Sequence, residues 1–165
     1  MGNVGRELLY WSDAPGVVQV GIDPGTEWTG LAFVQWPKYT MGTVETDCLF
    51  PVLSDLLNEW RMWPPGFADG IKELRIAYER PSLQNGKTWR TLGRISGFVC
   101  AAVFLLDGWR NEPPAHREVL PQQVRARVSK VDDLLSAMQP LDLEVEGLLD
   151  TRPVHAREAL ATLIR

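Results

Sequence analysis

The amino-acid sequence predicts one α/β domain in which helices flank a mixed central β-sheet. Apolar, β-branched runs come first in the chain, and strand-like and helix-like segments then alternate, an order typical of layered α/β folds. The 165 residues suffice for one hydrophobic core and leave little room for a second. Hydrophobic residues make up 45% and charged residues 23%, values typical of globular domains and not of disordered or collagen-like chains. We therefore expect residues 1–165 to form a single domain.

A β-hairpin is expected at the beginning of this domain. Residues 17–22 are rich in β-branched side chains and end at the turn signal Asp-Pro-Gly, residues 23–25. A second apolar run, residues 31–36, follows Gly30 and supplies the partner strand. Residues 1–15 precede the first strand and are interpreted as an N-terminal extension that can be flexible.

The later elements follow from the hydrophobic period and from the positions of proline and glycine. Apolar residues at helical spacing predict helices, and short β-branched or alternating runs predict strands. The predicted elements are a strand at residues 42–49, a helix at 52–62, a strand at 74–78, a long helix at 88–109, a short strand at 118–120, one or two helices within 122–138, and a final helix from Pro153 to the chain end.

Cysteine usage and hydropathy bear on the cellular compartment. Cys48 and Cys100 each lie in an apolar run without a CxxC pair, so they predict buried thiols in a reducing compartment and do not suggest a disulfide. The longest apolar stretch, residues 98–106, is far shorter than the roughly 20 residues that cross a bilayer. Residues 1–13 lack the pattern of a secretory signal. We expect a cytoplasmic protein without a membrane partner.

Charge is unevenly distributed along the chain, although the net charge is only −4. Between residues 80 and 130, nine basic residues stand against three acidic ones, so the flanks are strongly acidic. A basic middle of this kind is compatible with a polyanion-binding face and equally with ordinary solvated helix surfaces. The nine basic residues are Arg80, Lys87, Arg90, Arg94, Arg110, Arg117, Arg125, Arg127 and Lys130.

The first candidate for a metal site is Asp23, in the stretch Gly-Ile-Asp-Pro-Gly at residues 21–25. Its carboxylate ends a strand beside a stiff Pro-Gly backbone, and the glycines let a phosphate or metal approach the main chain closely. The alternative is a plain hairpin turn in which Asp23 caps the backbone. From this stretch alone the two interpretations are equally good.

Two further stretches place metal-binding side chains at suitable positions. Glu79 follows the strand expected at residues 74–78, and open α/β sheets have their active sites at the carboxyl ends of such strands. His155 and Glu158 are three residues apart and therefore lie on one side of the final helix. Each stretch taken singly also has a structural explanation: Glu79 as a solvated residue at a strand end, and His155 and Glu158 as polar residues on a helix surface. His116, beside two prolines, is assigned no role.

The three stretches in this order resemble the RuvC-type Holliday junction resolvases of the ribonuclease H-like superfamily. The family opens with a strand and the hairpin Gly-Ile-Asp-Pro-Gly-x-x-x-Thr-Gly, which residues 21–30 match. Its second carboxylate ends a strand, as Glu79 does, and precedes a helix with the core Leu-Gly-x-x-x-Gly, which residues 92–97 match. The resemblance runs from about residue 17 to residue 164. It implies a ribonuclease H-like fold with a mixed central sheet flanked by helices.

The resemblance continues in the second half of the chain with two departures. Gln123-Val124-Arg125 matches a Gln-Val-Lys-like step, Lys130 matches a following lysine, and residues 155–161 match the closing pattern Asp-x-x-Asp-Ala-Leu-Ala. His155 stands where Asp is commoner, and an imidazole is still a competent metal ligand. Glu158 also stands in place of Asp, and its additional methylene can change metal preference or rate.

The resemblance implies hydrolysis of a DNA phosphodiester with two Mg²⁺ ions per site, for which Mn²⁺ can substitute. In that mechanism Asp23 would bridge both ions, and Glu79 and Glu158 would bind the ions on either side of it. His155 would bind metal or handle a proton. Without metal, the three carboxylates repel DNA. We therefore expect divalent metal to be obligatory.

The implied substrate is branched DNA such as a four-way junction, recognised by its shape. A homodimer is also implied, in which Gly93 and Gly97 would permit close helix approach, although packing against the sheet explains them equally. Leu83, Trp89 and Tyr78 either stack on bases at the crossover or belong to the core or an interface. The candidate contacts to the DNA backbone, each of which is alternatively a solvated charge, are Lys87, Arg90, Arg94, Arg125 and Lys130.

Other functions compete with this one. The sequence separates a resolvase from another ribonuclease H-like nuclease only through the downstream Gln-Val-Arg and His-x-x-Glu matches. A non-catalytic junction-binding relative is a further alternative. An actin-like or sugar-kinase-like ATPase also has Asp-x-Gly-Thr after a strand, but it needs two such domains. A resolvase would act in the cytoplasm of a bacterium or of a phage-infected host. Residues 141–150 have no counterpart in the family and are interpreted as a loop that covers the edge of the site.

Overall fold

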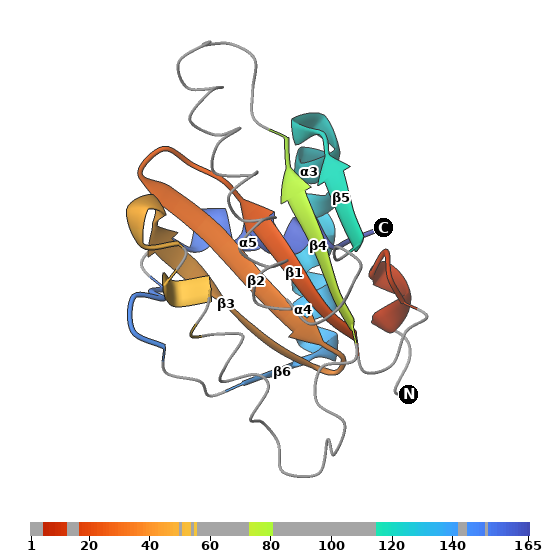
Figure 1. Ribbon diagram of the computed structural model, residues 1–165. Helices are drawn as coiled ribbons and strands as arrows, with labels where there is room; N and C mark the ends of the chain where they lie inside the picture. The colour runs from red at the N-terminus through yellow and green to blue at the C-terminus, as the bar shows by residue number, and fades with distance from the viewer. Residues whose placement is uncertain are drawn as a thin grey trace.

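A mixed six-stranded sheet forms the centre of the protein (Figure 1). The computed structural model describes residues 5–12, 17–49, 51–53, 55, 73–80, 115–141, 145–150 and 152–165. The strands are β1 (Val17–Asp23), β2 (Trp28–Gln35), β3 (Lys38–Glu45), β4 (Glu73–Glu79), β5 (Ala115–Val119) and β6 (Gln139–Pro140). Their order across the sheet is β5-β4-β1-β2-β3-β6, with β1–β2 and β2–β3 antiparallel and the other pairs parallel. The α/β class with a mixed sheet is thus confirmed.

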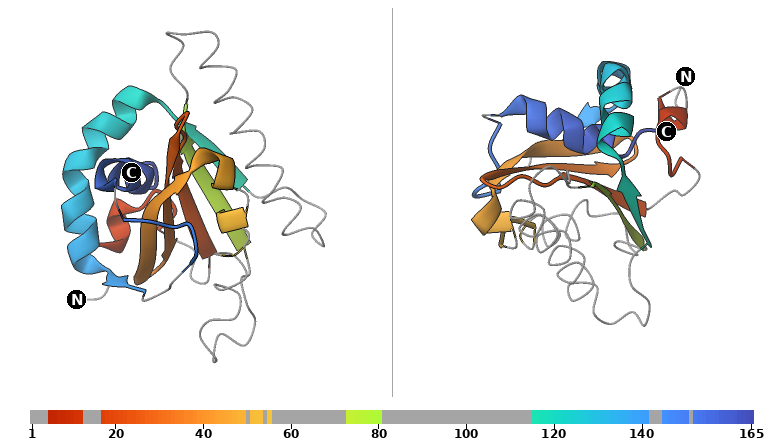
Figure 2. Two further views of the ribbon diagram at one scale, coloured as in Figure 1. Left: turned by 90° about the vertical axis from the view of Figure 1, so that its left-hand side faces the viewer. Right: turned by 90° about the horizontal axis from the view of Figure 1, so that it is seen from above.

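Helices cover one face of this sheet, as both views in Figure 2 show. α5 (Pro153–Ala161) lies directly on β1, β2 and β3, and α3 (Pro121–Arg127), η3 (Val128–Lys130) and α4 (Val131–Ala137) pack beside it. Because side chains alternate along a strand, β1 and β2 bury residues on both faces. The helical face buries Ala32, Val34, Leu134, Leu160 and Ile164, among others. The opposite face buries Val20, Ile22, Leu31 and Phe33 together with Leu49 and Leu53.

The predicted hairpin is present, and the strand after it begins earlier than expected. β1 and β2 pair in register from Gln19–Val34 to Asp23–Gly30. β3 starts at Lys38, four residues before the expected start, because the two-residue turn Trp36-Pro37 lets Lys38 pair at once with Gln35. β3 then gives way to η2 (Thr46–Cys48), where the prediction continued the strand to residue 49.

The segment at residues 5–12 is packed against the C-terminus, although the sequence suggested an extension that can be flexible. η1 (Arg6–Leu8) is followed by Leu9, which is fully buried and bridges to Ile164. The Tyr10 amide donates to the Leu163 carbonyl at 2.8 Å, and the Arg165 amide donates to the Leu8 carbonyl at 2.7 Å. α5 accordingly stops at Ala161, before the chain end where it was expected to stop.

Several smaller expectations have different outcomes. Cys48 is exposed in η2 and not buried, because the strand predicted there does not extend to it, whereas Cys100 lies outside the described residues. His116 lies in strand β5 and not in a loop. The first part of the helix expected at 52–62 is helical where it is described, and the helix expected at 88–109 lies outside the described residues. Among the described helices, none is long and apolar enough to span a bilayer.

Residues 145–150 lie along the edge of β3 beyond its pairing with β6. The Thr43 amide donates to the Leu149 carbonyl at 2.7 Å, and the Leu149 amide donates to the Thr43 carbonyl at 2.8 Å. This bridge lies two strands away from β1, because Thr43 pairs with Gly30 and Gly30 pairs with Asp23. Val145 and Leu148 belong to the core, which explains the apolar composition of the segment.

Candidate active site

Two carboxylates end adjacent parallel strands at one edge of the sheet. β1 and β4 pair up to Ile22 and Tyr78, and the next residues, Asp23 and Glu79, are the last of each strand. The carboxyl ends of parallel strands meet at the same edge, and side-chain alternation puts Asp23 on the face that carries α5. Asp23 is buried and Glu79 is half-buried. The sequence prediction that Asp23 and Glu79 belong together therefore agrees with their placement.

Two glycines of the hairpin motif bring α5 unusually close to the sheet. A Cβ built on Gly21 would overlap the carbonyl oxygen of Ala159, and one built on Gly30 would overlap the carbonyl oxygen of His155. Any larger residue at either position would push the helix away from β1 and β2. The motif glycines at 21 and 30 thus fix the distance between the strand that carries Asp23 and the helix that carries His155.

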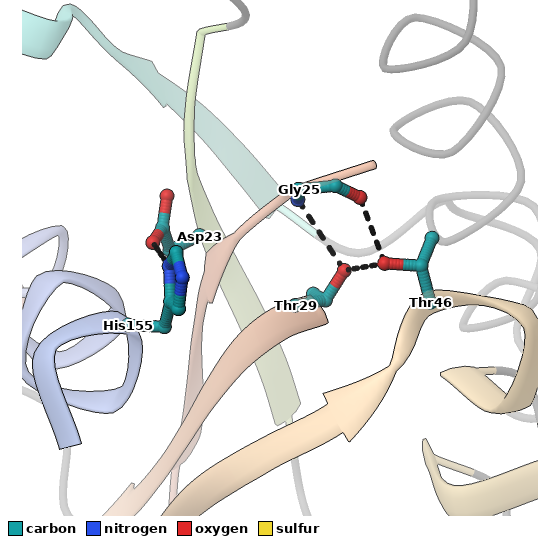
Figure 3. Close-up of polar contacts among 5 residues, drawn as sticks. All are labelled: Asp23, Gly25, Thr29, Thr46 and His155. Carbon is teal, nitrogen blue, oxygen red and sulfur yellow. Dashed lines mark hydrogen bonds and ion pairs between the residues drawn. The ribbon is translucent and has the colours of Figure 1, made fainter. Parts of the chain in front are cut away.

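This close approach completes a cluster of potential metal ligands. His155 Nδ1 lies 3.0 Å from Asp23 Oδ2, as Figure 3 shows. Glu158 follows one helical turn later on the same side of α5. One donor atom each from Asp23, His155 and Glu158 lies within 4.8 Å of the others. Two carboxylates and an imidazole at this separation fit a divalent cation such as Mg²⁺ or Mn²⁺.

The electrostatics of the cluster also favour the binding of a cation. Burial, hydrogen bonds to Glu79 and Glu158, and repulsion from both raise the pKa of Asp23 to about 10. Burial is also the largest cause that raises the pKa of Glu79, while its hydrogen bond to Asp23 and the nearby Arg125 act in the opposite direction. Carboxylates crowded in this way hold a proton unless a cation replaces it.

The loop that carries Asp23 is held by a second set of contacts, seen in Figure 3. The Thr46 hydroxyl donates to the Gly25 carbonyl at 2.7 Å, and Thr46 Oγ1 lies 2.9 Å from Thr29 Oγ1. Thr29 Oγ1 also accepts a longer bond from the Gly25 amide, at 3.4 Å. Thr29 belongs to the recognised motif, whereas no sequence pattern singles out Thr46. Its role follows from strand pairing, since β2 and β3 bring Trp28 opposite Glu45.

A cation–π pair at the N-terminal end of α5 also has no signal in the sequence. The Arg152 guanidinium carbon lies 4.8 Å from the centre of a Trp28 ring. Arg152 directly precedes α5, and Trp28 begins β2. Neither residue belongs to the specified positions of a motif, so only the tertiary structure brings them to notice.

The residues predicted to contact DNA lie in different places relative to the cluster. Arg125 is exposed on α3, and its charge opposes the rise of the Glu79 pKa, which places it near the cluster. Lys130 is exposed at the end of η3, and no described contact links it to the cluster. Tyr78 is half-buried and packs against the core on the opposite face, as the core alternative predicted, and its stacking on bases stays a prediction. Five other residues singled out from the sequence lie outside the described residues: Leu83, Lys87, Trp89, Arg90 and Arg94.

Comparison with known proteins gives a similarity in structure only. No family model matches the chain, and no curated protein matches its sequence. The structure of Thermus thermophilus RuvC in complex with a Holliday junction substrate is similar, with a TM-score of 0.56 and 18% identity over 89% of this chain and 90% of that chain. The fold is that of RuvC. A second T. thermophilus RuvC structure has the same TM-score and identity over 88% of this chain and 90% of that chain.

The RuvC similarity confirms the ribonuclease H-like fold that the sequence resemblance implied. A weaker likeness is that to YeaZ from Pseudomonas aeruginosa, at a TM-score of 0.45 and 18% identity over 70% of this chain and 49% of that chain. The RuvC matches span nearly the whole of both chains. The cluster of Asp23, His155 and Glu158 is therefore carried by a RuvC-like scaffold.

Proposed function

We propose that this protein is a divalent-metal-dependent endonuclease that resolves four-way or otherwise branched DNA junctions. The observation that carries the proposal is the cluster of Asp23, His155 and Glu158, with Glu79 on the adjacent strand, on a RuvC-like fold. The similar T. thermophilus protein was solved with a Holliday junction substrate, which makes a junction the first substrate to test.

Each residue of the cluster has a chemical task in this proposal. Asp23, Glu79 and Glu158 would hold two divalent cations, which would neutralise the developing charge of the phosphodiester and activate water. Asp23 would serve both ions, since both other carboxylates contribute to the rise of its pKa. His155 would either complete the ligand set or accept a proton near the attacking water. A bound cation would favour the ionised form of the buried Asp23.

In this proposal, basic residues hold the DNA. Arg125 is close enough to influence Glu79 and can contact a phosphate near the cut. Lys130, and the basic residues Lys87, Arg90 and Arg94, complete the proposed DNA-binding set. A homodimer would present two such sites to the two strands of a junction.

A labelled synthetic four-way junction, incubated with the protein and Mg²⁺ beside a linear duplex and an RNA–DNA hybrid, tests the proposal. We expect cutting of the junction only, and no cutting in EDTA or by Asp23→Asn, because the amide keeps the shape of Asp23 without its charge. Cutting of the hybrid alone would identify another type of ribonuclease H-like nuclease. Junction binding without cutting by the wild-type protein would identify a non-catalytic relative.

A further inference from the structure

Arg152, which directly precedes α5, has no described acidic partner, unlike Arg157 on that helix and Arg80 at the end of β4. Arg157 pairs with Asp132 at 2.7 Å, and Arg80 lies 3.7 Å from Glu118. In the part of the chain that the structure describes, the Arg152 guanidinium has neither a hydrogen bond nor an ion pair, and its one specific contact is the Trp28 ring at 4.8 Å. Arg152 is thus an exposed cation without a described ion pair.

The strand β2 and the helix α5 together fix where the Arg152 charge lies relative to the acidic cluster. Trp28 and Gly30 lie on the same face of β2, because residues two apart in a strand share a face. The backbone of His155 lies directly over Gly30, and Arg152 precedes His155 by three residues. Gly30 pairs with Asp23, so α5 crosses the sheet at this point. The Trp28–Arg152 pair therefore lies two residues along β2 from the place where α5 crosses above Asp23.

The cation–π contact determines what the pair can bind. A guanidinium held over a ring keeps its N–H groups free at its edge, in a planar arrangement that suits two oxygens of one phosphate. The ring face under Arg152 is covered and is not available for a base. Arg152 is also always positively charged, so it does not bind a metal cation. A phosphodiester is the ligand that fits.

We infer that Trp28 and Arg152 form a clamp for a backbone phosphate of the DNA strand that enters the site. The inference rests on the proposed function and adds a contact that is independent of metal. The cluster of carboxylates repels DNA before metal binds, whereas Arg152 attracts the strand at the N-terminal end of α5. Trp28 acts as a positioning residue, because it orients the guanidinium before the DNA arrives.

Equilibrium binding to a four-way junction between 50 and 200 mM NaCl tests the clamp, with all variants made in the Asp23→Asn background so that DNA is not cut. Arg152→Gln is expected to raise Kd about fivefold to tenfold and to reduce the slope of log K against log salt by about 0.9, the loss of one phosphate contact. Arg152→Lys should retain most of the slope. The matched control Arg165→Gln removes an exposed arginine beyond the other end of α5 and should change neither quantity.

The role of Trp28 is tested by a double-mutant cycle with Arg152. Trp28→Ala should raise Kd about twofold to fivefold, Trp28→Phe should restore part of the loss, and the double variant should bind no more weakly than Arg152→Gln alone. Additive losses would mean that Trp28 contacts the DNA itself, for example by stacking on a base, and would overturn its positioning role. Thermal unfolding of each variant shows whether a loss reflects folding.

The outcomes separate this inference from the proposed function. If the parent binds the junction and the wild-type protein cuts it, but Arg152→Gln keeps the parental Kd and salt slope, only the clamp is overturned. If the parent does not bind branched DNA at all, both the proposed function and the clamp are overturned. In the wild-type background, Arg152→Gln should raise KM and leave kcat nearly unchanged, because the contact is made equally before and during the reaction.

Discussion

Asp23 and His155 face each other across the candidate site, but the structure supports them in different ways. The Asp23 side chain is 9% exposed, and its strand is paired on both sides by β2 and β4. The His155 side chain is 38% exposed and lies in the first turn of α5, whose N-terminus has no side-chain cap. Asp23 is thus fixed by the hydrogen bonds of the sheet, and His155 by the packing of one helix.

This difference divides the site into a strand half and a helix half. The strand half contains Asp23 and Glu79, and its geometry follows from register and from the contacts of Thr29 and Thr46. The helix half contains His155 and Glu158, and its geometry depends on the close approach of α5 to Gly21 and Gly30. Substitutions in the two halves should therefore fail in different ways.

Among the predicted effects on junction cleavage, loss of a ligand charge in the helix half should be the largest. Glu158→Gln is expected to reduce junction cleavage about 10³-fold, or ~4 kcal/mol, because Mg²⁺ prefers anionic oxygen to a neutral amide. Single-turnover cleavage at saturating Mg²⁺ measures this loss. His155→Asp is the matched control that keeps a metal ligand, and it should stay active, whereas His155→Ala should need more Mg²⁺. Full activity of Glu158→Gln would remove the helix half from the metal site.

Separating the two halves without changing a ligand should have the next largest effect. In Gly30→Ala the new methyl overlaps the carbonyl of His155, so α5 must move away from the sheet. We expect a loss of about 2–4 kcal/mol in the free energy of unfolding, measured in urea, and a parallel loss of cleavage. Wild-type stability in Gly30→Ala would show that α5 adapts easily and would weaken the division into two halves.

The strand half could largely be predicted from the sequence, because its determinants are local. The run before Asp23, the Asp-Pro-Gly turn and the spacing to Gly30 encode a hairpin without reference to the rest of the chain. Predicting where Glu79 lies required only one further inference, that two parallel strands end at the same edge of the sheet. The resemblance to RuvC-type resolvases rested on these same residues, and the fold confirms it.

The helix half and the Trp28–Arg152 pair could be predicted less well, because tertiary contacts determine them. The i, i+3 spacing put His155 and Glu158 on one side of a helix, but it could not show that this side faces Asp23. Thr46 depends on where β3 ends, and the hydrophobic pattern extended that strand to residue 49, beyond its end at Glu45. The contact between Trp28 and Arg152 joins residues 124 positions apart in the sequence. No local pattern predicts such a contact.

The stability of the metal-free protein should fall as pH rises, and the strand half is the cause. The pKa of Asp23 is raised to about 10 in the folded protein from 3.8, so between these values the folded state binds the proton that the unfolded state releases. The free energy of unfolding therefore decreases with pH in this range, by at most ~1.4 kcal/mol per pH unit for one proton. Urea unfolding in EDTA at pH 5 to 8 measures the slope. Asp23→Asn should flatten it, and an equal slope in both proteins would contradict the assignment to Asp23.

The smallest expected effect concerns the hydroxyl of Thr46, which supports the loop after Asp23 without touching a ligand. Thr46→Val leaves the Gly25 carbonyl without its donor at 2.7 Å and Thr29 without its partner at 2.9 Å, at a cost of about 1 kcal/mol in stability. Cleavage should fall about tenfold through kcat, because Asp23 is held less rigidly while DNA binding is unchanged. Thr46→Ser keeps the hydroxyl and should restore both quantities. If Thr46→Val cuts at the wild-type rate, the pairing of β1 with its neighbours suffices to position Asp23, and the loop contacts serve stability alone.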